Sequence, residues 1–436
     1  MADEVGFATQ QVHAGERLDG DSAARITPIH LTAGFVFDDF DQARDRFHGD
    51  VEGFTYTRLG NPTTAAVERK LAALEHGVDA IAVASGQAAV TVALLALLRS
   101  GDRILASRSI YEGSRGLFRE NFANLGIGVD FVDDPRDLEE WRARIRPTTR
   151  VLFGESIPNP KNDVLDISGV AGVAHDHGLP LVVDSTLATP YLVRPIDFGA
   201  DVVVHSTSKF LAGHGASLGG AVVDGGRLDW AARPELFPQL TSPAAALGGR
   251  SYVERFGDRA FAEYARSVVA ARFGPTLSPL HAFLLQQGIE TLSLRIERHS
   301  ENALQVARWL EEQPEVASVD YSGLESSPYH GLAKRYLPRG QGSVFGFTLA
   351  GGEPAARAVV NAVTLFSRMT HLGDVRSLIL HPATTTHSLL SREELHANGI
   401  HPGLLRLSVG IEDVEDLLQD LAQALAASRR ARLEVA

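Results

Sequence analysis

The sequence of 436 residues contains no cysteine. Disulfide bonds, cysteine-based zinc or iron–sulfur sites and a catalytic thiol are therefore excluded. Basic residues are also scarce, because 41 Lys and Arg face 54 Asp and Glu, which gives a formal net charge of −13. Nucleic acids and anionic membranes bind to basic surfaces, so neither is expected as a partner.

Long apolar segments are absent as well. The longest, Ala88–Leu98, is too short to cross a bilayer and is interrupted by Thr91. The first residues, MADEVGFATQQ, lack the charged and apolar regions of a signal peptide. We therefore expect a cytoplasmic protein. Its composition, 44% hydrophobic and 22% charged, without repeats or low-complexity segments, is typical of a globular protein.

Short Val-rich segments alternate with helical patterns in the first half of the chain, and 181–183 and 202–204 are the clearest buried strands. This alternation predicts an α/β fold with a mostly parallel sheet covered on both faces. After the Gly/Pro/Ala-rich segment 238–257, the pattern changes to one long helix at about 279–312, followed by mixed strands and helices. We predict three parts: an extended N-terminal arm (1–60), a large α/β domain (61–257) and a smaller α+β domain (258–436).

Polar residues follow three of the predicted strands. In an open parallel sheet, ligands bind beyond the carboxyl ends of the strands. Strand 82–84 leads to Ser85-Gly86-Gln87 at the start of a helix, where free backbone N–H groups favour a phosphate. Strand 181–183 leads to Asp184, and strand 202–204 leads to a turn that ends at Lys209.

Each of these strand ends alone also fits a structural role: a capped helix, a turn cap or a lysine that extends to solvent. Together they fit one ligand, pyridoxal 5′-phosphate (PLP). Its phosphate suits the helix start, its aldehyde is captured by a lysine, and its ring nitrogen stays protonated beside a buried anion. The sequence therefore predicts a PLP site.

Two motifs favour a serine enzyme instead. Residues 215–219 match G-x-S-x-G, but an apolar strand follows them where that motif requires a helix. Residues 206–209 match S-x-x-K without its companion motifs. A serine acyl-enzyme hydrolase built on Ser206 or Ser217 and a non-catalytic binding module are the alternatives from other classes. Dinucleotide and P-loop signatures are absent, and the histidines lack the spacing of a metal site, so no metal is expected.

Seven motifs between about Thr9 and Leu425 resemble the cysteine/methionine-metabolism family of PLP enzymes of fold type I. They are YTRLGNPT (56–63), SGQAA (85–89), ESIPNP (155–160), VVDSTLATPYLVRP (182–195), VVHSTSKFLAGHGASLGG (203–220), HPATTTHS (381–388) and LLRLSVGIED (404–413). The resemblance implies an aspartate-aminotransferase-like large domain. It also implies that Lys209 binds the cofactor covalently and moves protons, that Asp184 pairs with the ring nitrogen, and that Tyr111 stacks on the ring.

Further residues receive roles from the same resemblance. The expected contacts of the cofactor are completed by Ser85, Gly86, Gln87, Asn159, Thr186, Ser206 and Ser208. Tyr56 and Arg58 are expected to reach the phosphate of a neighbouring subunit, which implies a catalytic dimer and, in this family, a tetramer of two dimers. The expected substrate site consists of Arg406, which binds the carboxylate, together with Asn159, His371 and Thr386.

The motifs at 213–220 and 381–388 resemble those of sulfhydrylases more than those of lyases. The implied reaction is a γ-replacement in methionine biosynthesis, in which sulfide or methanethiol displaces acetate from O-acetylhomoserine to give homocysteine or methionine. Cystathionine γ-synthase, cystathionine γ-lyase and O-succinylhomoserine sulfhydrylase are the alternatives within the family. The sequence departs from the family pattern at Glu112, Ser185 and His371, and Glu112 and His371 bear on the choice of substrate.

Overall fold

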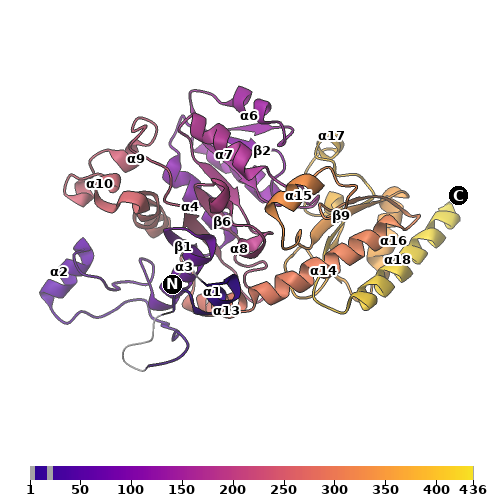
Figure 1. Cartoon of the computed structure of the whole chain (residues 1–436), viewed down its shortest axis with the longest axis horizontal. Coiled ribbons are helices and arrows are strands. Elements are labelled where there is room, and N and C mark those ends of the chain that lie inside the picture. Colours follow the sequence, from indigo (N-terminus) through magenta and orange to yellow (C-terminus); the bar gives the residue numbers. More distant parts are fainter. Residues whose placement is uncertain (1–4, 17–22, 436) are drawn as a thin grey trace.

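The computed structural model describes residues 5–16 and 23–435, which form two sheets, each with its own helices (Figure 1). The larger sheet has seven strands, and all neighbours are parallel except at β7, which is antiparallel to both of its neighbours. Its strands, in spatial order, are β1 (Asp79–Val83), β7 (Gly220–Asp224), β6 (Val202–His205), β5 (Leu181–Asp184), β4 (Thr149–Glu155), β2 (Arg103–Ser107) and β3 (Gly128–Val132). The predicted mostly parallel α/β sheet is confirmed.

Side chains alternate along these strands and are buried on both faces. Val182 and Val204 contribute to one core, whereas Val183 and Val203 contribute to the other. This period of two is the pattern expected for central strands covered by helices on both sides. The helices on the first face are α4 (Gly86–Leu97), α10 (Tyr252–Phe256), α11 (Ala260–Tyr264) and α12 (Ala271–Phe273). Those on the second face are α1 (Phe7–His13), α3 (Pro62–Glu75), α6 (Leu138–Arg144), α7 (Ile167–Asp176) and α13 (Pro279–Ile289).

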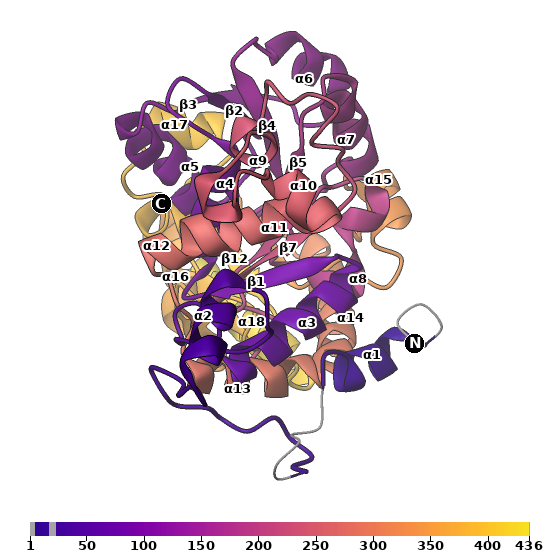
Figure 2. The ribbon, with the colours of Figure 1, turned by 90° about the vertical axis from the view of Figure 1, so that its left-hand side faces the viewer.

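Figure 2 shows α4, α10, α11 and α12 on one side of β1 and α1, α3 and α13 on the other. Helix α11 and the π-helical segment Ala265–Ala270 that follows it, which the division made from the sequence gives to the C-terminal domain, pack on the large sheet through Ala260, Phe261 and Ala265. Short helices complete the large unit. They are α5 (Glu112–Gly116), α8 (Thr189–Leu192) and α9 (Pro238–Thr241).

Helix α3 begins at a capping Asn that is followed by Pro. The Asn61 side chain accepts a hydrogen bond from Thr63 N (3.0 Å), and Pro62 occupies the first helical position. An Asn cap followed by Pro is a strong start signal because neither residue costs the helix an internal hydrogen bond. The helix ends at Glu75, and the next residue, His76, caps it in the left-handed conformation (φ 59°).

The second sheet has five strands and carries the C-terminal helices. In spatial order the strands are β10 (Ser367–Arg368), β11 (Leu378–Leu380), β12 (Leu404–Ser408), β9 (Val344–Leu349) and β8 (Val316–Asp320). The helices of this part are α14 (Leu292–Glu311), α15 (His330–Tyr336), α16 (Gly352–Ala362), α17 (Arg392–Ala397) and α18 (Val414–Val435). The long helix expected at 279–312 is two helices, α13 and α14, and α14 contributes to the cores of both units.

The N-terminal segment from Ala23 to Asp39 contains no helix or strand apart from an isolated β-bridge between Gly34 and Tyr56, and α2 (Phe40–His48) projects away from the large sheet (Figure 1). Helix α1 lies within the predicted arm (1–60), of which residues 1–4 and 17–22 lie outside the described residues. In the described part of the chain, none of the helices combines the length and the apolar composition needed to cross a bilayer.

Candidate active site

A cavity of about 630 Å³ lies beyond the carboxyl ends of β4, β5 and β6, against the second sheet. All of the site residues expected from the sequence, except Tyr56 and Arg58, line this cavity. They are Ser85, Gly86, Gln87, Tyr111, Asn159, Asp184, Thr186, Ser206, Ser208, Lys209, His371, Thr386 and Arg406. The structure thus brings together residues that lie far apart in the sequence. Ser85 and Arg406, for example, are separated by 321 positions (406 − 85).

The start of α4 forms one end of the cavity. Ser85 caps the helix, since its Oγ accepts a hydrogen bond from Ala88 N (3.1 Å). A Cβ at Gly86 would lie 2.5 Å from the Cβ of Ser206, so only glycine allows this approach. The backbone N–H groups of Gly86 and Gln87 have no acceptor among the described residues. Free N–H groups at a helix N-terminus suit an anion such as a phosphate.

Thr186 connects the ends of β5 and β6. Its Oγ1 donates to Asp184 Oδ1 (2.5 Å) and accepts from Ser206 N (2.8 Å). Thr186 N also donates to Asp184 Oδ1 (2.9 Å). Asp184 Oδ2 has no donor among the described residues. One oxygen therefore holds the carboxylate in place, and the other is available to a ligand in the cavity.

Glu155 and Asp184 lie side by side at the ends of β4 and β5. Burial raises the pKa of both carboxyl groups; the charge of Asp184 raises the pKa of Glu155 further, and the Thr186 hydrogen bonds partly offset the effect at Asp184. Glu155 Oε1 accepts a hydrogen bond from Tyr111 N (2.6 Å) and so holds the start of the Tyr111 loop. No Lys or Arg forms an ion pair with either carboxylate in the described part of the chain, so a cationic ligand would be stabilised here.

Lys209 follows the turn after β6 and extends into the cavity. Its Nζ lies 3.2 Å from His371 Nδ1. Burial lowers the pKa of Lys209 to about 8, and the nearby Arg406 guanidinium contributes in the same direction. About a tenth of this lysine is therefore a free amine at pH 7, far more than for a lysine of ordinary pKa, and the free amine is the nucleophilic form.

Arg406 reaches the cavity from β12 and is buried. Its Nη1 donates to Asn159 Oδ1 (3.3 Å), and its Nη2 donates to the carbonyl oxygens of Thr370 (3.0 Å) and His371 (3.1 Å). Its Nε is buried without a partner in the described part of the chain. Burial lowers the pKa of Arg406 to about 10. A carboxylate in the cavity would accept a hydrogen bond from Arg406 Nε and would neutralise the positive charge of the guanidinium.

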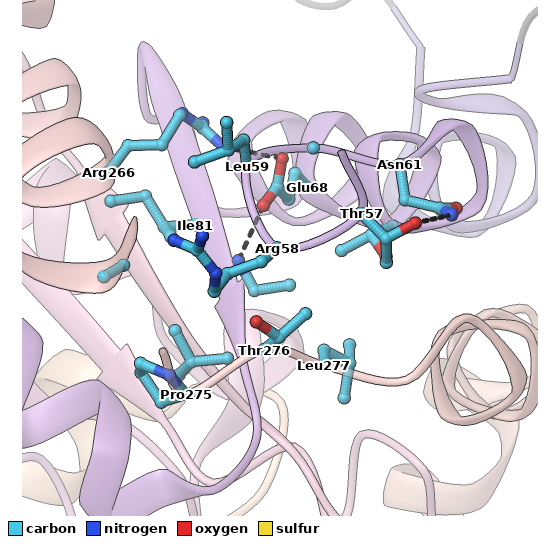
Figure 3. A pocket seen from close by; sticks show the side chains of 15 residues that line it. Thr57, Arg58, Leu59, Asn61, Glu68, Ile81, Arg266, Pro275, Thr276 and Leu277 are labelled. Carbon is cyan, nitrogen blue, oxygen red and sulfur yellow. Dashed lines mark hydrogen bonds and ion pairs between the residues drawn. The ribbon is translucent and has the colours of Figure 1, made fainter. Parts of the chain in front are cut away.

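Tyr56 and Arg58 lie elsewhere in the single chain. Arg58 donates to the carbonyl oxygen of Ala271 and its guanidinium lies over the Tyr56 ring. Figure 3 shows Arg58 in a small pocket whose other charged residues are Glu68 and Arg266. Within one chain, the structure does not bring these two residues to the main cavity.

Comparisons with known proteins agree with this geometry. The sequence model of the family described as "Cys/Met metabolism PLP-dependent enzyme" matches residues 8–426. The O-acetyl-L-homoserine sulfhydrylase of Corynebacterium glutamicum is 44% identical over 98% of each chain, and the homocysteine synthase of Schizosaccharomyces pombe is 43% identical over 96% of this chain and 98% of its own. The chain belongs to the Cys/Met metabolism family of PLP-dependent enzymes.

A crystal structure of an O-acetylhomoserine (thiol)-lyase from Campylobacter jejuni has the same fold. It superposes with a TM-score of 0.93 at 35% identity, covers 97% of this chain and 100% of its own, and carries an N′-pyridoxyl-lysine-5′-monophosphate residue. The predictions of the family, of fold type I and of PLP as cofactor are confirmed. The names of the relatives also agree with the predicted γ-replacement.

The cavity of this family member fits PLP on three observations from its own residues. The unpaired amides at Gly86 and Gln87 suit the phosphate, the unpaired Asp184 oxygen suits a protonated ring nitrogen, and Lys209 supplies the amine for the aldehyde. The serine-hydrolase alternative loses its support. Ser217 lies in the loop before β7, and its Oγ donates to a backbone carbonyl, that of His281 (3.3 Å), rather than to a base.

Two buried titratable residues that line the cavity were missed by the sequence reasoning. Glu155 ends an apolar strand just as Asp184 does, so the rule that located Asp184 would have located it too. His387 follows the predicted Thr386, whose Oγ1 lies 2.9 Å from His387 Nδ1. Burial lowers the pKa of His387 to about 4, so it is neutral near pH 7. No local pattern distinguishes His387 from the other histidines of its segment.

Proposed function

We propose that this enzyme is a transferase of methionine biosynthesis, which replaces the acetate of O-acetyl-L-homoserine with sulfide or methanethiol to give homocysteine or methionine. One observation carries the proposal: Lys209, Asp184 and Arg406 meet in one cavity of a chain that is 44% identical, over 98% of its length, to an O-acetyl-L-homoserine sulfhydrylase. Bound PLP supplies an electron sink for charge that develops at the α carbon of the substrate.

The residues of the chain would divide the remaining work as follows. Arg406 binds the substrate carboxylate through its unpaired Nε, with Asn159, His371 and Thr386 around it. Lys209 would hold the cofactor through its amine and would move protons at the α and γ carbons of the substrate. Asp184 keeps the ring nitrogen protonated, and Tyr111 stacks on the ring. The phosphate contacts are Ser85, Gly86, Gln87, Thr186, Ser206 and Ser208.

The proposal includes a cytoplasmic homotetramer built from two catalytic dimers, with Tyr56 and Arg58 of each chain reaching the phosphate in a neighbouring subunit. Apolar side chains exposed along the N-terminal segment support it. Four of them are 67–93% exposed: Leu31, Val36, Phe40 and Phe47. Exposing several large apolar side chains to water is unfavourable, and such surfaces mark sites of protein–protein contact. We expect the Arg58→Ala variant to lose its cofactor on dilution more readily than the native enzyme does. Equal retention in both proteins would contradict the contact between subunits.

The test of the reaction is product analysis. The purified enzyme, reconstituted with PLP, receives O-acetylhomoserine with sulfide, and homocysteine and acetate are quantified. We expect both products in equal amounts. The matched arms replace the ester with O-succinylhomoserine, or the sulfide with cysteine. Faster turnover of the succinyl ester, or a preference for cysteine that yields cystathionine, would overturn the substrate assignment and leave PLP chemistry in place.

A further inference from the structure

The ring of His371 has one hydrogen-bond partner in the described part of the chain, and that partner is Lys209. The two nitrogen atoms, Nζ of Lys209 and Nδ1 of His371, lie 3.2 Å apart although the residues are 162 positions apart in sequence. The other ring nitrogen of His371, Nε2, is buried without a partner. The imidazole of His371 therefore takes part in the hydrogen-bonding network of the cavity through its contact with Lys209.

The loop that carries His371 is fixed against the segment that carries Lys209. Gly373 adopts φ 76°, and a Cβ there would lie 2.7 Å from Phe210 N and 3.1 Å from the carbonyl carbon of Lys209. Further along, Val375 N donates to Gly213 O (2.9 Å), and Gly213 N donates to Lys209 O (2.7 Å). The imidazole and the lysine are thus held at a set separation by their backbones.

Arg406 fixes the same loop from the opposite side, because its Nη2 donates to the carbonyl oxygens of Thr370 and His371. Arg406 and Lys209 are also the positive groups that face the imidazole, and the negative group is Asp374. Asp374 is engaged by Arg376, whose backbone N and Nη1 each lie 3.0 Å from its Oδ1.

These surroundings set the protonation state of His371. Burial lowers its pKa below the ordinary value, and the charges of Lys209 and Arg406 lower it further, which outweighs Asp374. The imidazole is therefore neutral near pH 7, and a neutral imidazole has one acceptor nitrogen. With Nδ1 as that acceptor, the ammonium of Lys209 donates to it, and Nε2 carries the ring proton.

We propose that His371 is a positioning residue for Lys209: its Nδ1 accepts a hydrogen bond from the Lys209 ammonium and orients the remaining N–H bonds toward the substrate. The inference rests on the proposed function, in which Lys209 takes a proton from a substrate carbon and later gives one up. No proton passes to His371 in this scheme, because the imidazole orients the group that carries the proton.

The test measures the pKa of Lys209 in the full-length protein stripped of PLP. The chain has only four lysines, Lys70, Lys161, Lys209 and Lys334. Trace acetylation at a series of pH values, followed by digestion and mass spectrometry, therefore gives a titration curve for each. Hydrogen bonds to charged groups stabilise them, so we expect His371→Leu to lower the pKa of Lys209 by about one unit.

Two further variants separate this hydrogen bond from a general change in the cavity. His371→Gln retains an acceptor oxygen and is expected to restore most of the Lys209 pKa. His387→Leu removes a neutral histidine of the same cavity that has no hydrogen bond to Lys209 in the described part of the chain, and it is expected to leave the titration curve of Lys209 unchanged. An unshifted curve for His371→Leu, or the same shift in His371→Leu and His371→Gln, would overturn the proposal.

The reconstituted enzyme provides a second readout. We expect His371→Leu to lower kcat about tenfold with a smaller change in KM, since Lys209 is misplaced while Arg406 still binds the substrate carboxylate. A rise in KM with an unchanged kcat would show a substrate contact instead and contradict the positioning role. The acetylation experiment needs neither cofactor nor substrate. Its outcome therefore tests the role of His371 independently of the assignment of O-acetylhomoserine as the substrate.

Discussion

Two lysines of this chain lie in the interior and differ in what surrounds them. Lys70 is fully buried between α3 and α1, where its Nζ donates to the carbonyl oxygens of Gln11 (3.0 Å) and Val12 (2.9 Å). Glu16 and Glu290 lie 3.9 and 4.0 Å from it. Lys209 has His371 as its one hydrogen-bond partner in the described part of the chain, and its charged neighbour, Arg406, is also positive.

Burial lowers the pKa of both lysines, but only at Lys70 do nearby carboxylates counteract the effect. Buried carboxylates differ in the same way. Glu68 accepts from Ala82 N (2.9 Å) and pairs with Arg266 (2.9 Å). Glu155 and Asp184 instead accept hydrogen bonds from neutral donors and form no ion pair in the described part of the chain, and Arg115 and His205 make only the smaller contributions to their pKa values. A buried charge that its own chain compensates is structural. One that is left uncompensated at a cavity wall indicates a place for a ligand.

The largest effect expected from this contrast follows Lys209→Ala. Removal of the group that moves protons lowers turnover by at least about 10²–10⁴-fold and abolishes the covalent bond to the cofactor. Because Lys209 is only half-buried and its side chain lines the cavity, the thermal unfolding temperature is expected to stay near that of the native enzyme. Turnover within tenfold of the native rate would contradict the assignment.

Asp184→Asn is expected to have the next largest effect. The amide keeps the shape of the carboxylate but cannot hold a proton on the ring nitrogen of PLP. The variant should therefore bind the cofactor and lose about 10²-fold or more in turnover. Equilibrium dialysis and steady-state kinetics measure the two quantities separately. Glu68→Gln is the matched control, since it alters a buried carboxylate outside the cavity, and its main effect is expected on unfolding.

Lys70→Met should reverse the pattern of Lys209→Ala. The carbonyl oxygens of Gln11 and Val12 lose their donor, which lowers the free energy of unfolding by roughly 1–3 kcal/mol. Turnover per folded molecule is expected to be unchanged. Urea denaturation followed by circular dichroism gives the free energy. A variant with native stability and impaired turnover would break the distinction between the two lysines.

The smallest expected effect is on the pH dependence of cofactor capture. The burial and the positive neighbour that lower the pKa of Lys209 to about 8 favour the free amine, which is the reactive form. The rate at which stripped protein captures PLP should rise about tenfold per pH unit below pH 8 and level off above it. For an ordinary lysine, with a pKa of about 10.4, the rate of capture would continue to rise up to about pH 10. Stopped-flow absorbance distinguishes the two profiles.

The strand ends were predictable because their signal is local. Val-rich strands that end in Asp184 or lead to Lys209 place those residues at the edge where ligands bind, whatever the rest of the fold does. Helix α1 was missed because two of its three buried residues, Gln10 and Gln11, are polar, so no apolar period marks it. The break between α13 and α14 was missed because Glu290-Thr291 contains neither Gly nor Pro.

The contacts that complete the site depend on tertiary structure. Residues of the second sheet reach the cavity only after the chain has folded back, so His371 and Arg406 followed from the family resemblance and not from any local pattern. The hydrogen bond between His371 and Lys209 has no counterpart in composition or periodicity. The position of Tyr56 and Arg58 outside the cavity likewise follows from packing within one chain.

The most direct test of the account locates the cofactor among the four lysines. The purified enzyme with bound PLP is treated with borohydride, which makes the bond between lysine and cofactor permanent, and is then digested and analysed by mass spectrometry. The account predicts one pyridoxyl group per chain, on the peptide that contains Lys209. A pyridoxyl group on Lys70, Lys161 or Lys334, or none on any lysine of a protein saturated with PLP, would contradict it.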